Sequence, residues 1–273
     1  MSYVEPIKTR KHLKHAERYL KKNHDLAFTL VWNIGIESGL RISDILKLQY
    51  RNINLSNGQC EIIESKGTLA RRAKAKMRVL KKVKEELLFH YQARGLSKKM
   101  SIIYITPPQL IVSFIPKSWE STVNERVKHA IDSASPVTRT FYLSESILIT
   151  LKQRKQEYKE LANDYIFNRQ TLSSNRAKGG EGLLTRQACW YVFSKLTAIL
   201  KEIGVDVKVG CHTLRKSFAR HLYFATGKDI GLLMTVIGHQ SESMSLRYIG
   251  LSKDETELAQ KKLIVYLSRK TRI

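Results

Sequence analysis

Apolar residues recur at helical spacing over most of this chain, and this pattern most limits the folds open to it. Between residues 7 and 39 they include Leu13, Ala16 and Leu20, and Gly39 is a suitable C-cap for the helix that they predict. The pattern therefore predicts a mainly helical protein. The further helices that it predicts span residues 43–48, 144–161, 185–203, 212–226, 229–237, 241–249 and 254–267.

Alternation of apolar and polar residues replaces the helical spacing in two places. The segment NINL, a turn at residues 56–58 and the segment QCEIIES predict a β-hairpin that leads to Lys66. The segment TRTFYL, residues 138–143, predicts another strand. We therefore expect a mainly α protein with a small antiparallel β-sheet, an α+β fold. A Ser/Gly-rich stretch at 173–182 is the best candidate for an internal linker.

Net charge limits the partners of the chain. Its 273 residues include 48 Lys and Arg against 24 Asp and Glu, which leaves a formal charge of +24. Because 42% of the residues are apolar, this is a folded protein and not a basic disordered tail. Such a charge on a folded chain favours nucleic acid as the partner, and less often an anionic membrane surface or an acidic protein.

Several other classes lack their sequence signatures. The N-terminus has no apolar core of the signal-peptide type, and the longest apolar run, 102–116, contains prolines and is too short to span a bilayer. No GxxxxGK[ST] motif occurs, and carboxylates never cluster as a two-metal site requires. Three widely spaced cysteines fit a reducing compartment. We therefore expect chemistry without ATP or a metal.

Six residues that suit transfer at a phosphodiester lie in separate short segments. Taken singly, each has an ordinary structural explanation: Arg41 can pair with Asp44, and Tyr248 can be a half-buried packing residue. Their order and intervals say more, since His239 follows Arg215 by 24 residues and Tyr248 follows His239 by nine. The six are Arg41 in SGLRISDILKL, Lys66 in EIIESKG, His212 and Arg215 in CHTLRKSFARHL, His239 in VIGHQS and Tyr248 in SLRYIG.

These segments closely resemble those of the tyrosine recombinase, or phage integrase, family, over roughly residues 10–66 and 138–265. The resemblance implies the family's catalytic-domain fold. It implies a site-specific DNA recombinase that cuts and rejoins strands through a 3′-phosphotyrosyl intermediate, for integration or excision of a mobile element. It also implies double-stranded DNA as substrate and a homotetramer on two DNA sites, with room for an accessory DNA-binding partner. It implies no cofactor, metal or membrane. The protein would be bacterial or phage-encoded and would lie at the nucleoid.

The residue types also suit metal-free transesterification on physical grounds. Two guanidiniums, those of Arg41 and Arg215, can neutralise the non-bridging oxygens of the phosphate, because each presents paired N–H donors and stays protonated. The phenol of Tyr248 suits the nucleophile, since a group with an ordinary pKa near 10 also leaves readily in the reverse step.

The other residues suit proton transfer and support. His212 suits a general base, or a group that orients the phenol. Lys66 on a movable hairpin would protonate the departing 5′-hydroxyl, and His239 would be a further donor to the phosphate. The resemblance implies the same roles, and it makes Asp44 a support for Arg41 that is not itself catalytic.

The middle of the chain departs from the family pattern. In the family a strand follows the lysine hairpin within several residues, whereas here two segments compete for that place: 74–91 and 138–153. The cleaner alternation of the second favours it. On this interpretation residues 67–137 are an insertion in the lysine hairpin, and the catalytic domain consists of 1–66 and 138–273.

The insertion is either an elaborated lobe with little specific role or a basic arm that contacts DNA. Residues 71–82 carry many cations and no acid, a pattern suited to a phosphate backbone. Few residues precede the first helix, so we do not expect a complete N-terminal core-binding domain. The candidate DNA contacts are Arg71, Arg72, Lys74, Lys76 and Arg78.

Two alternatives stay open. A type IB topoisomerase uses a similar residue set to cut and reseal one strand, and the short interval between His239 and Tyr248 favours a recombinase over it. A DNA-binding protein with the catalytic fold but no turnover is the alternative from another class.

Overall fold

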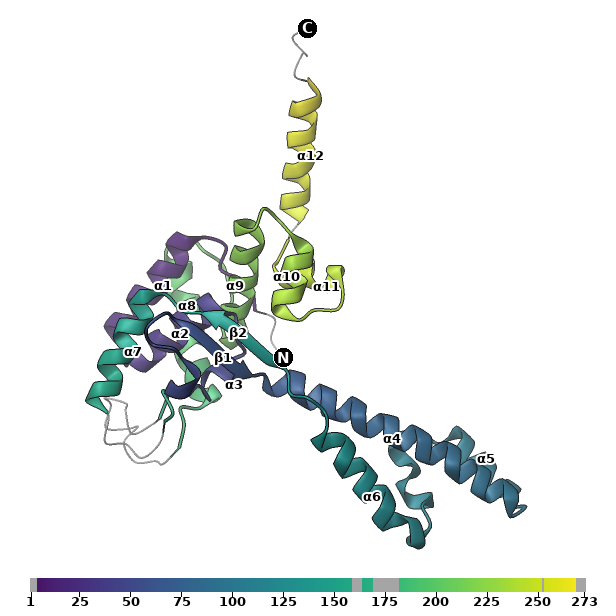
Figure 1. Cartoon of the computed structure of the whole chain (residues 1–273). Helices are drawn as coiled ribbons and strands as arrows, with labels where there is room; N and C mark the ends of the chain where they lie inside the picture. The colour runs from purple at the N-terminus through teal and green to yellow at the C-terminus, as the bar shows by residue number, and fades with distance from the viewer. Residues whose placement is uncertain (1–3, 159–163, 169–181, 252, 269–273) are drawn as a thin grey trace. The chain divides into compact units, whose positions relative to one another are not determined.

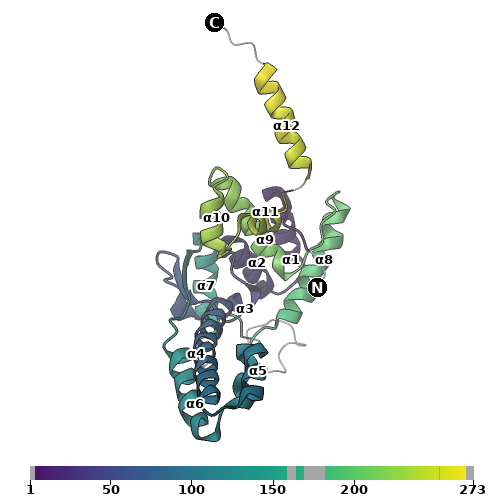
Figure 2. The same cartoon turned by 90° about the vertical axis from the view of Figure 1, so that its right-hand side faces the viewer.

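The computed structural model describes residues 4–158, 164–168, 182–251 and 253–268 (Figures 1 and 2). The chain forms two compact units. We call residues 1–60 with 141–273 the main unit and residues 61–140 the arm. The prediction of a mainly helical protein with a small sheet is confirmed. No helix in the described ranges is long and apolar enough to cross a membrane.

The helices and strands have the following bounds. The main unit contains α1 (Arg10–Asn23), α2 (Leu26–Ser38), α3 (Ile42–Ile45), the 3-10 helix η1 (Tyr50–Asn52), α7 (Glu145–Glu157), α8 (Arg186–Glu202), α9 (Cys211–Ala225), α10 (Ile230–Ile237), α11 (Glu242–Tyr248) and α12 (Lys253–Ser268). The arm contains α4 (Ser65–Ala93), α5 (Ser97–Ile105), the 3-10 helix η2 (Pro108–Phe114) and α6 (Lys117–Asp132). Strands β1 (Gln59–Ile63) and β2 (Thr138–Tyr142) lie where the chain passes from one unit to the other.

The strand at residues 138–142 is present as predicted, and the hairpin before it is present in a short form, in which the N–H of Asn54 donates to the carbonyl of Gln59 at 2.8 Å. β1 pairs with β2, and the segment NINL contributes only an isolated bridge between Ile53 and Cys60. The side-chain oxygen of Asn54 accepts the N–H of Ser56 at 3.0 Å, so residues that were expected to extend the first strand form a tight turn. The predicted hairpin is therefore shorter than expected, and β1 also pairs with the strand on the far side of residues 64–137.

The single helix predicted over residues 7–39 is two helices. Asp25 lies between the two helices. Its carboxylate accepts the N–H of Ala27 at 2.8 Å and so caps the start of α2. Gly39 caps the end of α2 with φ +61°, as expected. A side chain at Gly35 would collide with Leu214, so glycine allows α2 to pack closely against α9. This contact sets the end of α2 beside the part of α9 that carries Arg215.

The arm is a packed helical unit with its own core. Its long helix α4 has 29 residues, and Leu80, Val83 and Leu87 of this helix pack with apolar residues of α5, η2 and α6. Segment 74–91 is therefore helix throughout and not a strand. Lys66 lies in the first turn of α4 with an exposed side chain, which corrects its expected place on a β-hairpin.

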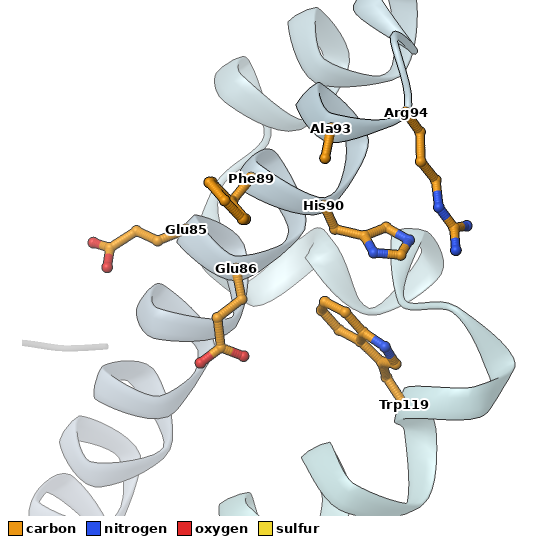
Figure 3. Close-up of a pocket in the computed structure, with 7 residues that line it drawn as sticks. All are labelled: Glu85, Glu86, Phe89, His90, Ala93, Arg94 and Trp119. Atoms are coloured by element: carbon orange, nitrogen blue, oxygen red, sulfur yellow. The ribbon is translucent and has the colours of Figure 1, made fainter.

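The far half of α4 also carries a shallow pocket of about 590 Å³ (Figure 3). The ring of His90 meets Trp119 edge to face there, with 4.8 Å between ring centroids. Glu86, at the same pocket, forms an ion pair with Arg126 at 2.8 Å. The acidic residues of α4 thus lie in its second half.

Two predictions fall partly outside the described residues. The linker at 173–182 does so except for residue 182. The last residues of the helix predicted over 144–161 do so as well, and α7 ends at Glu157.

Candidate active site

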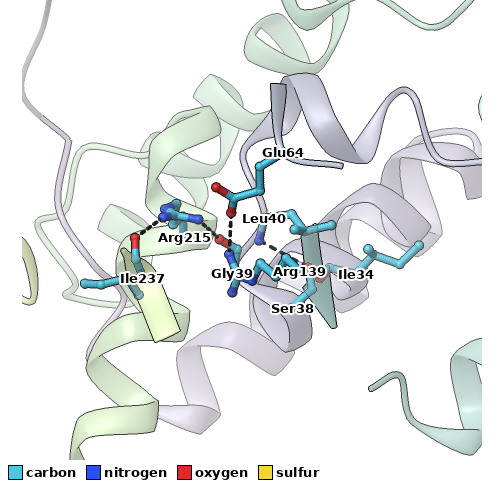
Figure 4. Close-up of polar contacts among 8 residues, drawn as sticks. All are labelled: Ile34, Ser38, Gly39, Leu40, Glu64, Arg139, Arg215 and Ile237. Atoms are coloured by element: carbon cyan, nitrogen blue, oxygen red, sulfur yellow. Dashed lines mark hydrogen bonds and ion pairs between the residues drawn. The ribbon is translucent and has the colours of Figure 1, made fainter. Parts of the chain in front are cut away.

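Arg215 of α9 lies at the centre of the candidate site. Its side chain is buried, and the residue is 5% exposed. Nη1 donates to the carbonyl of Gly39 at 2.6 Å, and Nη2 donates to the carbonyl of Ile237 at 2.5 Å (Figure 4). The guanidinium fork therefore joins the end of α2 to the end of α10, two elements far apart in the sequence.

Arg41 enters the site from the turn between α2 and α3. The left-handed conformation of Gly39 turns the chain, and Arg41 follows in extended conformation as the N-cap of α3. Its carbonyl accepts the N–H of Asp44 at 2.8 Å, and Asp44 is 4% exposed. The Arg41 charge acts on both Tyr248 and His239: it contributes to the lowered pKa of His239 and opposes the effect of burial on the pKa of Tyr248.

His239 follows the turn at Gly238 that ends α10. Its Nδ1 lies 3.1 Å from the hydroxyl of Ser245, and that hydroxyl donates to the carbonyl of Ser241 at 3.2 Å. The Nδ1 of His239 and this hydroxyl therefore share a hydrogen bond whose direction depends on the tautomer of the ring. Burial, with the charges of Arg215 and Arg41, holds the pKa of His239 below its ordinary 6.5.

Tyr248 ends α11 with its phenol directed to the same place. Its ring meets His239 edge to face, with 4.8 Å between centroids. Arg215 donates a hydrogen bond to the phenol. Burial raises the pKa of Tyr248 above its ordinary 10, while Arg215 and Arg41 act in the opposite direction. The phenol is therefore protonated at neutral pH and needs a base before it can attack.

The structure brings four of the six predicted residues together in the main unit: Arg41, Arg215, His239 and Tyr248. His212 lies in the first turn of α9, one turn before Arg215, and is exposed. Lys66 belongs to the arm, and the structure does not assign it to this cluster.

The cluster suits an anion. Two guanidiniums and an imidazole converge beside one phenol, and such donors fit the oxygens of a phosphate. Within the described ranges, no three His, Cys, Asp or Glu side chains come close enough together to hold a metal ion.

Two further cations of α9 escaped the sequence reasoning. Lys216 donates from Nζ to the carbonyl of Val4 at 2.8 Å and lies 5.5 Å from the centroid of the Tyr248 ring. Arg220 donates from Nη1 to the carbonyls of Ile249 and Gly250, at 3.0 and 3.2 Å. Arg220 therefore holds the backbone that follows Tyr248, and Lys216 joins α9 to the N-terminal segment at Val4. The available signal was the unusual number of cations in the apolar helix LRKSFARHL.

The chain is similar to several known proteins. Residues 120–255 match the model of the phage integrase family. The chain is 27% identical over 190 residues to the probable integrase/recombinase YoeC of Bacillus subtilis (strain 168), covering 68% of this chain and 94% of that one. It is 34% identical over 102 residues to the tyrosine recombinase XerD of Listeria monocytogenes serotype 4b (strain F2365), covering 37% of this chain and 29% of XerD.

The crystal structure of XerA recombinase superimposes with a TM-score of 0.52 at 14% identity, covering 100% of this chain and 68% of XerA. The fold is thus that of tyrosine recombinase catalytic domains. The chain belongs to the phage integrase family, whose tyrosine recombinases are DNA strand transferases.

Proposed function

We propose that this chain is a site-specific DNA recombinase that cuts duplex DNA with Tyr248 and rejoins it through a 3′-phosphotyrosyl intermediate. One observation carries the proposal: the Tyr248 ring meets the His239 ring edge to face at 4.8 Å, and the charges of Arg215 and Arg41 act on the same phenol. A phosphate bound by both guanidiniums would lie beside the attacking oxygen.

In the proposed cleavage step, the Tyr248 oxygen attacks the scissile phosphorus, and the bond from phosphorus to the 5′-oxygen breaks. Arg41 and Arg215 stabilise the charge on the non-bridging oxygens. As the family resemblance implies, His212 would take the phenolic proton, and Lys66 would protonate the departing 5′-oxygen, which leaves as a 5′-hydroxyl. A free 5′-hydroxyl of another strand then attacks the phosphotyrosine and restores the phenol, so no external energy source is required.

His239 would contribute as a phosphate donor. Its low pKa keeps the ring neutral near pH 7 without substrate. The negative charge of an incoming phosphate raises that pKa, so binding favours the protonated ring and adds a positive donor to the site.

Exchange between two DNA sites would use four copies of the chain. Apolar side chains near the end of α12 are exposed, with 55% exposure at Leu263 and 70% at Leu267. These positions suit docking against a neighbouring copy. We propose integration or excision of a mobile element as the role, with room for an accessory DNA-binding protein.

A nicked suicide substrate tests the proposal. The protein is incubated with nicked duplexes whose cleavage region is randomised, and the covalent adduct is isolated and mapped by mass spectrometry. We expect an adduct at Tyr248, and we expect Tyr248→Phe to abolish it with little change in DNA binding. Tyr191→Phe is the matched control, because Tyr191 is 59% exposed on α8.

Three results would count against the proposal. An adduct formed by Tyr248→Phe would mean another nucleophile. Binding without any adduct would favour the non-catalytic DNA-binding protein. Relaxation of supercoiled plasmid without strand exchange would favour the topoisomerase.

A further inference from the structure

The arm carries an open groove of about 740 Å³ between α4 and the end of α6. The cations on its α4 side recur every three to four residues, so they share one face of the helix. The other lining residues are Ala75 and Val79 on α4, Ala130 on α6, and Ser133, Ala134 and Ser135 after α6. The groove cations are Arg71, Lys74, Arg78, Lys81 and Lys82.

No ion pair of the arm joins these cations to an acid, and the nearest effect of an acid is at Lys82, whose charge helps to lower the pKa of Glu86. The structure describes residues 61–140 throughout, and the ion pairs there join Glu86 to Arg126 and Glu64 to Arg139. Arg71 donates to the backbone carbonyls of Ser135 and Pro136, at 3.4 and 3.3 Å. The groove is therefore strongly positive.

The position of these cations is unfavourable for the helix itself. Lys74, Arg78 and Lys82 follow one another at intervals of four residues, and like charges at this spacing repel. A bound polyanion would relieve this repulsion.

We propose that this groove binds the phosphate backbone of duplex DNA, as a contact additional to the active site. The proposal rests on the proposed function only in taking duplex DNA as the substrate. From Arg71 to Lys82 the helix rises about 16 Å, at about 1.5 Å per residue. That length matches about five phosphates of one strand, which are about 3.4 Å apart along the duplex axis.

The lining chemistry favours duplex DNA over other polyanions. The groove has no aromatic residue on which the bases of a single strand would stack. It also has no large apolar side chain of the kind that enters a membrane surface. The exposed hydroxyls of Ser133 and Ser135 are suitable further donors to phosphate oxygens.

The structure separates the cations that the sequence grouped together. Arg72 and Lys76 were predicted as DNA contacts, but neither lines the groove. At about 100° per residue they lie roughly 100° and 140° around α4 from Arg71. Both are exposed, so they provide a control with the same charge on the same helix.

The experiment compares Lys74→Gln/Arg78→Gln with Arg72→Gln/Lys76→Gln in the full chain. Each variant loses two positive charges and keeps good helix-forming residues. Binding to a fluorescent duplex of about 30 base pairs of random sequence is measured across a salt series. We expect the groove variant to reduce the slope of log K against log salt by about 1.8, and the control to change it by less than about 0.5.

Affinity of the groove variant should fall on the order of tenfold or more near 0.1 M salt. Equal losses in the two variants, or no loss in either, would overturn the proposal, since charge and not the groove would then decide binding. A groove-dependent preference for single-stranded DNA or for anionic vesicles would overturn it in favour of that partner. The helical circular dichroism signal and the melting temperature are compared between the two variants. Equal values exclude misfolding of the arm as the cause of a difference in binding.

The adduct assay separates this proposal from the proposed function. The groove variant should still form the Tyr248 adduct at saturating nicked DNA. An unchanged salt slope together with a normal adduct would refute the groove alone. A normal groove effect without any adduct would refute the recombinase mechanism alone.

Discussion

Replacing Arg215 by alanine tests the organisation of the site most directly. The side chain is buried and donates to the carbonyls of Gly39 and Ile237 and to the phenol of Tyr248. Arg215→Ala removes these donors at once. Two buried carbonyls then lose a charged partner, and the turn before Arg41 loses its connection to the end of α10.

The size of the effect follows from these contacts. A buried acceptor left without its partner costs about 1–3 kcal/mol, so the two carbonyls set a range of about 2–6 kcal/mol. Alanine also removes the cost of burying a guanidinium, which offsets part of that loss. We therefore expect a net loss of about 2–4 kcal/mol, or a fall in melting temperature of about 5–15 °C for a unit of this size.

The measurement has to report on each unit, because the arm has its own core. Thermal melting by circular dichroism is combined with hydrogen exchange by mass spectrometry, and we expect faster exchange in α10, α11 and the end of α2. Arg215→Lys is the matched control, since it keeps the charge but cannot bridge both carbonyls with one planar fork. A fall of less than about 2 °C for the alanine variant, with unchanged exchange in these segments, would refute the reasoning.

Three other outcomes are expected. Gly39→Ala should destabilise the main unit by about 2–4 kcal/mol in urea unfolding, because φ is +61° and the new Cβ would collide with the Phe218 ring; unchanged unfolding would contradict this. The folded-state pKa of His239 lies below 6.5, so the unfolded state binds protons first as the pH falls. The stability present above pH 6.5 should therefore decrease toward pH 5, and His239→Gln should lessen that decrease. Burial raises the pKa of the Cys60 thiol to about 12 and that of the Cys211 thiol to about 11. The buried cysteines should therefore resist iodoacetamide at about pH 8 until urea unfolds the chain. Rapid labelling of the native protein would argue against their burial.

Local signals predicted the helices of the main unit well. Thr185, Asp229 and Ser241 each accept a backbone N–H at the start of the helix that the sequence predicted to follow. These caps depend on residues a few positions apart, so no tertiary contact is required to recognise them. The alternation in TRTFYL indicated β2 for the same reason.

The partner of β1 and the course of the chain after it depended on distant residues. β1 pairs with a strand more than 70 residues later, whereas the neighbour that the hairpin signal at Asn57-Gly58 indicated contributes only a bridge between Ile53 and Cys60. The strand or helix choice at 74–91 was settled by packing, since Leu80, Val83 and Leu87 meet apolar residues of α6 and its neighbours.

The amino-acid sequence by itself determined the helical character, the charge of the arm and the six residues whose order matches the family. Tertiary structure alone decided which of them meet: α2 and α9 pack closely through Gly35, and this contact brings Arg215 to the carbonyl of Gly39 and to the phenol of Tyr248. It also divided the basic residues of α4 between a groove and an outer face. The physical reason is that caps and periodicity act over a few residues, whereas burial and the convergence of charges depend on segments that fold together from far apart in the chain.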